Sequence, residues 1–236
     1  MNILALDTAT ENCSAALWAG ERLYLREEVA LQKHAELILN MADSLLKESR
    51  TERSALDVIA FDCGPGSFTG VRIATAAAQG LALGLNLPVI PVTSLEAMAW
   101  SAFQDPAPEF CISAVDARMG EVYLGIYRRS GFSPRPLCPP AVLKPEAALE
   151  MIGAKLPDGD AVTLAGTGID VLKAHGLNKK STPAVLYPSA RAIVELGLYR
   201  IREGQTVSAA EALPVYLRNE VTWKKLSEQG KVHQGV

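Results

Sequence analysis

The chain has 236 residues, of which 49% are hydrophobic and 21% are charged, and its formal net charge at pH 7 is −3. These values fit a globular protein with a substantial core, built as one large domain or two small ones. The mildly acidic balance excludes a strongly basic, stand-alone nucleic-acid binder, because phosphate binding relies on clustered lysines and arginines. If the chain acts on RNA, we expect another subunit to supply the basic surface.

The N-terminal run from Met1 to Asp7 has no basic region and meets an acidic residue too early for a signal peptide. The longest uncharged stretch, 73–95, is interrupted by glycines and prolines, so we expect no membrane span. The four cysteines are widely spaced and form no metal-binding pattern. We therefore predict a cytoplasmic protein with reduced thiols and no metal site.

The first hundred residues alternate strand and helix patterns in the order β-β-β-α-β-α-β-α, which indicates a mixed sheet with a parallel part. A glycine-rich turn, 64–67, separates the fourth strand from the second helix. The expected strands are 3–7, 13–18, 22–28, 58–61 and 89–92, and the expected helices are 32–49, 68–85 and one that opens at Ser94.

The second half begins the same way, with an apolar strand ending on Asp116, a polar turn and an alternating strand. Later elements are less clear: a helix at 145–152, a strand at 162–165 and a helix at 189–203. This order favours a duplicated α/β domain, although an apolar run ending on Asp is common at strand ends. We place the halves at 1–103 and 109–213, followed by a C-terminal strand or helix, 214–236, that packs back between them.

Asp7 and Asp116 each end the first strand of a half, so in a duplicated fold they should converge on the cleft between halves. There they could hold Mg²⁺ and the phosphates of a weakly bound ATP or ADP, with Thr8 and Thr10 as donors. The equally weighted alternative is local capping, since Asp at a strand–turn junction accepts backbone hydrogen bonds. No cofactor is expected to be required.

The segment from Gly64 to Gly70 lies between a strand and a helix but is not a phosphate-binding Walker loop. No lysine follows its last glycine, and Pro65 removes one N–H donor. We therefore favour a tight strand-to-helix turn with Ser67 or Thr69 as the helix cap. The run from Ala165 to Gly168 matches only weakly the glycine-rich segment that would contact the adenosine of a bound nucleotide.

The two long helices of the first half carry more apolar surface than one core stripe needs. The second has no charged residue after Arg72 and is rich in alanine. A chain of this size has little protein left to cover a second face, so a partner is favoured over a deep intramolecular groove. The residues predicted for this interface are Leu37, Met41, Leu45, Val71, Ala74, Ala78 and Leu81.

No catalytic constellation is recognisable. The three histidines lie far apart and show no metal-ligand spacing, and no strained nucleophile turn accompanies a Ser-His-Asp set. We predict no catalytic residue and no resident metal.

Five segments resemble the bacterial TsaB family, also called YeaZ, along almost the whole chain. Two are especially specific: Gly-Pro-Gly-Ser-Phe-Thr-Gly-Val-Arg-Ile at 64–73 and Val-Asp-Ala-Arg-Met-Gly-Glu-Val-Tyr at 115–123. The others are Ile-Leu-Ala-Leu-Asp-Thr-Ala-Thr at 3–10, Gln-Gly-Leu-Ala-Leu-Gly at 79–84 and Pro-Val-Tyr-Leu-Arg at 214–218.

This resemblance implies an actin/Hsp70/sugar-kinase-like (ASKHA) fold of two ribonuclease-H-like βββαβαβα halves. It implies a non-catalytic scaffold that activates TsaD during N6-threonylcarbamoylation of adenosine 37 in tRNAs reading codons that begin with A. TsaD would bind through the first two helices, with TsaE joining the complex and TsaC supplying threonylcarbamoyl-adenylate. A homodimer would use the same helices when TsaD is absent. The chain would contact tRNA only as part of the complex.

TsaD-type sequences carry two metal-binding histidines four residues apart on the helix after the fifth strand. The matching positions here are Ser94 and Met98, and neither suits a hard or borderline catalytic ion. The resemblance thus implies an inactive paralogue, with no residues for peptide hydrolysis. The alternative from the residues is a nucleotide-binding ATPase or kinase that uses Asp7 and Asp116 in the cleft.

Overall fold

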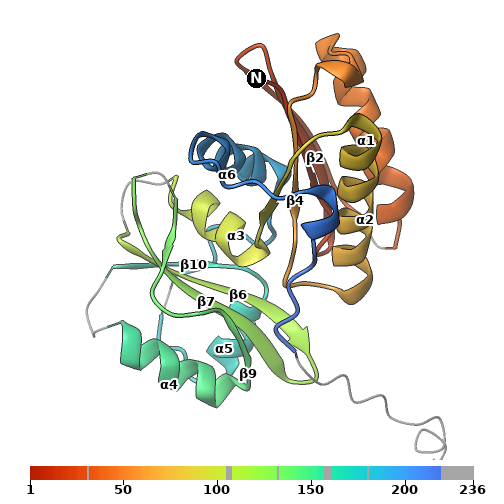
Figure 1. Cartoon of the computed structure of the whole chain (residues 1–236). Helices are drawn as coiled ribbons and strands as arrows, with labels where there is room; N and C mark the ends of the chain where they lie inside the picture. Colours follow the sequence, from red (N-terminus) through yellow and green to blue (C-terminus); the bar gives the residue numbers. More distant parts are fainter. Residues whose placement is uncertain (31, 105–107, 132, 157–160, 180, 219–236) are drawn as a thin grey trace, which may run out of the picture.

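The structure, a computed structural model, describes residues 1–30, 32–104, 108–131, 133–156, 161–179 and 181–218. Two β-sheets form the centres of two halves, with helices packed on both faces of each (Figure 1). In the described part of the chain, no helix is long and apolar enough to cross a membrane.

The first sheet has the strand order β3-β2-β1-β4-β5, as expected of a ribonuclease-H-like half. β1 runs antiparallel to β2 and parallel to β4, with Ile3 opposite Trp18 on one side and Val58 on the other. β1 and β4 are buried along their whole length because helices cover both sheet faces. The strands are β1 (Ile3–Asp7), β2 (Asn12–Ala19), β3 (Arg22–Val29), β4 (Val58–Asp62) and β5 (Val89–Val92).

Helices α1 (His34–Ser49) and α2 (Phe68–Leu85) lie side by side on one face of this sheet (Figure 1). The opposite face is covered by α6 (Ala190–Arg202), which comes from the end of the chain. We expected this last helix to belong to the second half, but its apolar stripe, including Ile193 and Leu196, packs on β1, β4 and β5 instead.

The second sheet repeats part of the first. β6 pairs antiparallel with β7 and parallel with β10, as β1 pairs with β2 and β4. The predicted eight-element order is reduced here, because among the described residues this sheet continues beyond β10 only as a parallel bridge between Ala165 and Val185, in the place that β5 takes in the first sheet. The elements are β6 (Phe110–Arg118), β7 (Glu121–Arg128), β8 (Arg135–Pro136), β9 (Ala141–Leu143), α4 (Pro145–Lys155), β10 (Val162–Ala165) and α5 (Gly168–Ala174).

Helix α3 (Ser94–Ala102) lies between the halves and contributes to the cores of both. Ala97 packs with the residues beneath α6, whereas Leu95 and Met98 pack against β6, β7 and β10. The two halves are therefore joined by a shared hydrophobic core as well as by the linker.

The described part of the C-terminal segment bridges the two halves. The Val215 N–H donates to the Cys63 carbonyl of the first half, at 2.7 Å. The Arg218 guanidinium bonds to Glu121 and to the Ala117 carbonyl of the second half. Residues 219–236, the remainder of the strand or helix predicted to pack between the halves, lie outside the described residues.

A largely buried ion pair fixes α6 against α3 and β5. The Arg200 guanidinium bonds to the Glu96 carboxylate and to the Pro91 carbonyl, and the two side chains are only 20% and 12% exposed. Burial raises the pKa of Glu96, and Arg200 opposes that rise. Loss of the guanidinium would leave a buried, unpaired carboxylate.

We predict that Arg200→Ala lowers the free energy of unfolding by about 3 kcal/mol, because breaking a buried pair costs more than the pair itself contributes. Urea denaturation followed by circular dichroism measures this change. The double variant Arg200→Ala with Glu96→Gln should recover part of the loss. No recovery would mean that packing of the arginine stem, not its charge, holds α6 in place.

Candidate functional site

The ends of β1 and β4 bring two carboxylates together in the core. Asp7 and Asp62 are fully buried, and they lie close enough that each influences the protonation of the other. The Asp62 Oδ1 accepts the Gly64 N–H at 2.7 Å and the Ser94 hydroxyl at 2.7 Å. Its Oδ2 accepts no hydrogen bond from the described residues, which leaves it open to a proton held on Asp7.

Burial and the neighbouring Asp62 charge raise the pKa of Asp7 well above its usual range. Burial likewise raises the pKa of Asp62, to about 6. Two carboxylates this close in a dry environment cannot both ionise easily. The pair therefore shares a proton, and the Asp7 Oδ1 also accepts the Ala9 N–H at 2.9 Å, a local cap of its own turn.

The glycine turn packs directly on the turn that follows β1. A Cβ at Gly66 would lie 2.2 Å from the Ala9 carbonyl oxygen, and one at Gly70 would lie 2.0 Å from that of Thr8. Only glycine fits such contacts. The Thr8 hydroxyl donates to the Gly70 carbonyl at 2.6 Å, so this donor is already used within the chain.

Ser67 caps α2, accepting the Gly70 N–H at 3.0 Å. This confirms the interpretation of the segment as a tight strand-to-helix turn with Ser67 as cap. The run at 165–168 plays the same part in the second half, since a Cβ at Gly166 would lie 2.0 Å from the Ala114 carbonyl oxygen. Its glycines are thus explained by packing on β6.

A cleft of about 1030 Å³ lies between the halves. Of the four residues predicted for a nucleotide site, Thr10 and Asp116 line it, whereas Asp7 and Thr8 do not. The Asp116 carboxylate accepts the Arg118 N–H at 2.8 Å. Arg118 also pairs with Glu11 across the cleft, at 3.2 Å. Both predicted aspartates therefore cap their own turns, and a nucleotide-binding role stays a prediction.

The two positions that correspond to metal-binding histidines of TsaD-type sequences are both buried. Ser94 gives its hydroxyl to Asp62, and the Met98 side chain packs in the core beside Leu95 and Ala165. Among the described residues, no three His, Cys, Asp or Glu side chains gather as a metal site would require. The residues at these two positions act structurally.

Helices α1 and α2 offer an accessible surface, but not through all the residues predicted for it. Leu37, Met41 and Leu81 are partly exposed. Leu45, Val71, Ala74 and Ala78 are buried against the sheet in the chain's own core, so a partner cannot reach them. The periodicity showed the apolar rows correctly, but the sheet covers four of the seven residues that we assigned to the partner.

The accessible surface consists instead of the outer stripe of α2 and the groove beside α1. Leu83 is 78% exposed and Leu39 is 49% exposed. A Cβ added at Gly80 or Gly84 would meet nothing within 4 Å. Neither glycine is therefore needed for packing inside the chain, and both leave room for another backbone to approach closely.

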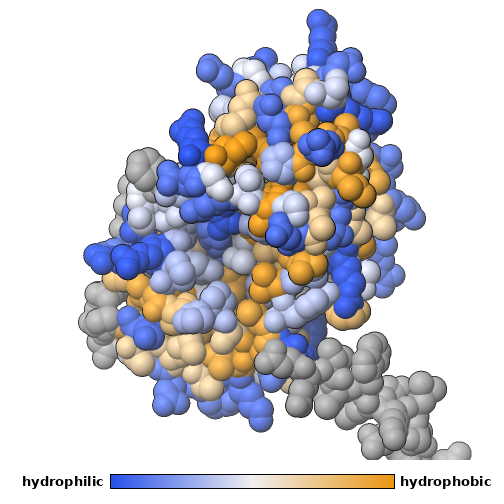
Figure 2. Space-filling view, in the orientation of Figure 1, coloured by the Kyte–Doolittle hydropathy of each residue, from blue (hydrophilic) through white to orange (hydrophobic). Residues whose placement is uncertain are grey.

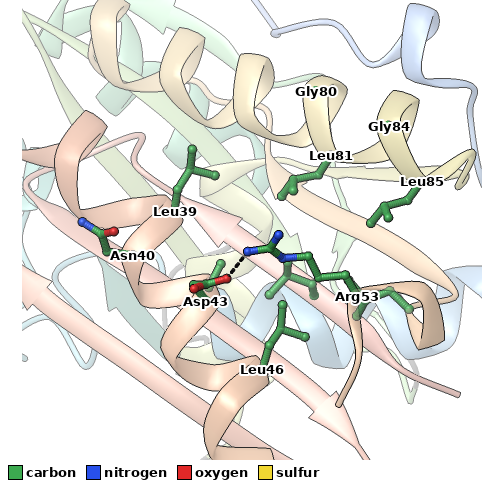
Figure 3. A pocket seen from close by; sticks show the side chains of 12 residues that line it. Leu39, Asn40, Asp43, Leu46, Arg53, Gly80, Leu81, Gly84 and Leu85 are labelled. Atoms are coloured by element: carbon green, nitrogen blue, oxygen red, sulfur yellow. Dashed lines mark hydrogen bonds and ion pairs between the residues drawn. The ribbon is translucent and has the colours of Figure 1, made fainter. Parts of the chain in front are cut away.

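A groove of about 500 Å³ opens between the two helices. Figure 3 shows Leu39 from α1 facing Leu81 and Leu85 from α2, with the ion pair between Asp43 and Arg53 in the middle of the view, between Leu81 and Leu46. Figure 2 shows hydrophobic side chains scattered over this side of the first half, among polar ones. The groove is thus lined mainly by leucines, with one ion pair among them.

The family model for TsaD, tRNA N6-adenosine threonylcarbamoyltransferase, matches residues 27–225. A tRNA threonylcarbamoyladenosine biosynthesis protein TsaB from Escherichia coli is 42% identical over 96% of this chain and 98% of its own length. The chain belongs to the TsaB family. The corresponding protein of Haemophilus influenzae is 40% identical over 96% of this chain and 97% of its own.

The solved structure of YeaZ from Pseudomonas aeruginosa matches with a TM-score of 0.79 and 38% identity, covering 92% of this chain and 99% of that one. The two-sheet architecture, the TsaB/YeaZ assignment and the fold class are therefore established. Sequence reasoning missed Asp62 as the partner of Asp7, although its place at the end of β4 was a usable signal. It also missed Leu39 and Leu83 on the outer surface.

We predict that Asp62→Asn raises the free energy of unfolding at pH 7 by on the order of 2 kcal/mol. The pKa values of Asp7 and Asp62 in the folded chain exceed the value of about 4 in the unfolded chain. Above pH 4 the folded wild type therefore binds more protons than the unfolded chain. Its stability therefore falls as the pH rises from about 4 through about 6. Asparagine does not titrate, and its amide can donate to Asp7.

Urea denaturation at a series of pH values between 4 and 8 measures the effect, and the advantage of Asp62→Asn should shrink toward pH 4. Asp170→Asn, at an exposed position on α5, is the matched control and should follow the wild-type profile. Parallel profiles for wild type and Asp62→Asn would contradict the shared proton.

Proposed function

We propose that this TsaB-family chain is a non-catalytic scaffold that activates TsaD during formation of N6-threonylcarbamoyladenosine at position 37 of tRNA. Family membership supports the pathway, because the full-length relatives are named for the biosynthesis of this nucleoside. The observation that carries the scaffold role is the open surface of α1 and α2, where Gly80 and Gly84 stand free of intramolecular contacts.

This surface suits a helical partner. Small residues along α2 allow two helices to approach closely, and the leucines beside them supply area to bury. The exposed side chains of Leu39 and Leu83 lie beside these small residues and add apolar area that a partner would bury. TsaD is the proposed occupant, and a second copy of the chain would use the same surface when TsaD is absent.

The non-catalytic part of the proposal is supported by the residues at the ligand positions. The Ser94 hydroxyl donates to Asp62, and the Met98 thioether packs in the core. Neither position therefore offers a ligand for a catalytic ion. We propose that the chain needs no cofactor of its own, joins TsaE only within the larger complex, meets tRNA only there and works in the cytoplasm.

The competing function is a nucleotide-binding ATPase or kinase in the cleft between the halves. The size of the cleft favours it, as does the presence of Thr10 and Asp116 in its wall. The packing of α2 on the turn after β1 weighs against it, since Thr8 and the turn backbone are already engaged. We therefore keep it as the second candidate.

We predict that Leu83→Glu lowers the affinity for TsaD at least tenfold, because a desolvated charge would face an apolar contact. Isothermal titration calorimetry with purified TsaD measures it, and the variant should unfold at the wild-type temperature since Leu83 is 78% exposed. Leu186→Glu, at a leucine 49% exposed in the second half, is the matched control. Equal binding by both variants would place the interface elsewhere.

We predict that Asp116→Ala supports the reaction at close to the wild-type rate, because the Asp116 carboxylate caps its own turn. Threonylcarbamoyladenosine formation from TsaC, TsaD, TsaE and tRNA, with and without this chain, provides the measurement. Calorimetry of the isolated chain with MgATP tests the second candidate directly. Lost modification with an intact complex, or clear MgATP binding, would favour that candidate.

A further inference from the structure

At the N-terminal end of α2, an arginine stacks on one exposed aromatic ring and lies beside a second. The Arg72 guanidinium carbon lies 3.2 Å from the centroid of the Phe68 ring and 5.4 Å from that of Tyr216. The two rings are 53% and 50% exposed by residue, and their centroids lie 6.5 Å apart. We call Phe68, Arg72 and Tyr216 the arginine–aromatic cluster.

Stacking prepares the guanidinium for a planar anion. Its face is covered by Phe68, and its edge keeps the fixed fork of N–H donors that matches a carboxylate. Because the side chain is already oriented, less conformational entropy is lost when an ion pair forms. Arginine and tyrosine are also the residue types most enriched at the energetic centres of interfaces.

Arg72 differs from the other arginines of the same cleft wall. Arg118 is paired with Glu11 and Asp116, and Arg218 is paired with Glu121. Arg72 makes no ion pair or hydrogen bond with any residue that the structure describes, apart from its two ring contacts. The N–H edge of its guanidinium is thus available to another molecule.

The position of Arg72 on α2 connects it to the docking surface. Arg72, Ala76 and Gly80 follow one another at intervals of four residues and are all exposed, so they share one face of the helix. Leu83 completes this outer stripe, about 16 Å along the axis from Arg72. A helix laid on the stripe, as the proposed function requires, would end beside the arginine.

A second copy of the chain offers little to this arginine. Helix α2 has no acidic residue. On α1, Asp43 pairs with Lys47 and Arg53, and Glu48 pairs with Arg26. Glu36 is the single acidic side chain of the two helices without an ion pair to a described residue. In a homodimer, Arg72 would therefore meet an apolar stripe or Glu36 alone.

We infer that Arg72, held by Phe68 and Tyr216, receives a carboxylate of the TsaD-type partner and makes the heterodimer tighter than the homodimer. The inference rests on the proposed function, because it assumes that this partner docks on α2. The ion pair fixes the register of the partner along the stripe and supplies the charge discrimination that small apolar residues cannot.

The test measures affinity for purified TsaD by calorimetry at 50 and 500 mM NaCl, and self-association by sedimentation velocity. Arg72→Gln should weaken TsaD binding about tenfold or more at low salt and reduce its salt dependence. Arg72→Lys should restore only part of the affinity, since lysine lacks the planar fork. Self-association of Arg72→Gln should equal that of the wild type.

Arg22→Gln is the matched control. The Arg22 guanidinium also stacks on a tyrosine, 5.5 Å from the Tyr24 ring centroid, but it lies on the edge strand β3, away from α2. The affinity of this variant for TsaD should be unchanged. Absence of TsaD binding by the wild type would overturn the proposed function itself. Wild-type binding with an unchanged Arg72→Gln affinity would overturn only the present inference.

Three further outcomes would also overturn it. Equal weakening of self-association by Arg72→Gln and Glu36→Gln would mean that a second copy supplies the carboxylate. A lower melting temperature of isolated Arg72→Gln, compared with Arg22→Gln, would mean that the arginine acts within the chain. Unchanged TsaD affinity combined with weaker tRNA binding by the assembled complex would assign Arg72 to a phosphate.

Discussion

The contact on which the rest of the molecule depends is the backbone packing of the glycine turn on the turn after β1. Because Gly66 and Gly70 have no Cβ, the start of α2 can lie against the Ala9 and Thr8 carbonyls. This contact closes the end of β1 and β4 over the Asp7–Asp62 pair. It also fixes the direction in which α2 leaves the sheet, and hence which stripe of α2 faces outward.

The same contact limits the chemistry of the cleft. In the first half, the groups that could cradle a phosphate instead satisfy one another: Thr8 donates to Gly70, and the Ser67 N–H donates to Ala9. In the second half, Gly166 packs on β6 in the corresponding way. A cleft remains, but its aspartates cap turns and its arginines, Arg72 excepted, are already paired.

The proposed function therefore uses the outer face of the first half. The sheet takes one stripe of α2 for the core, and the opposite stripe, with its two open glycines, is left for a partner. An apolar stripe of small residues can bind a partner helix but does not discriminate between partners, since it would bind a second copy of the chain as readily as TsaD. In our inference, the charge of the arginine–aromatic cluster at the end of the stripe distinguishes TsaD from a second copy of the chain.

The sequence by itself determined the TsaB family, the βββαβαβα order of the first half and a tight turn before α2 capped by Ser67 or Thr69, because these follow from local periodicity, turn chemistry and contiguous motifs. Only the tertiary structure decided the packing of α6 on the first sheet and the burial of Leu45, Val71, Ala74 and Ala78. Periodicity identifies an apolar row but does not say which neighbour covers it. The Asp7–Asp62 pair and the Arg72 cluster join residues that are distant in sequence, so only the folded chain brings them together.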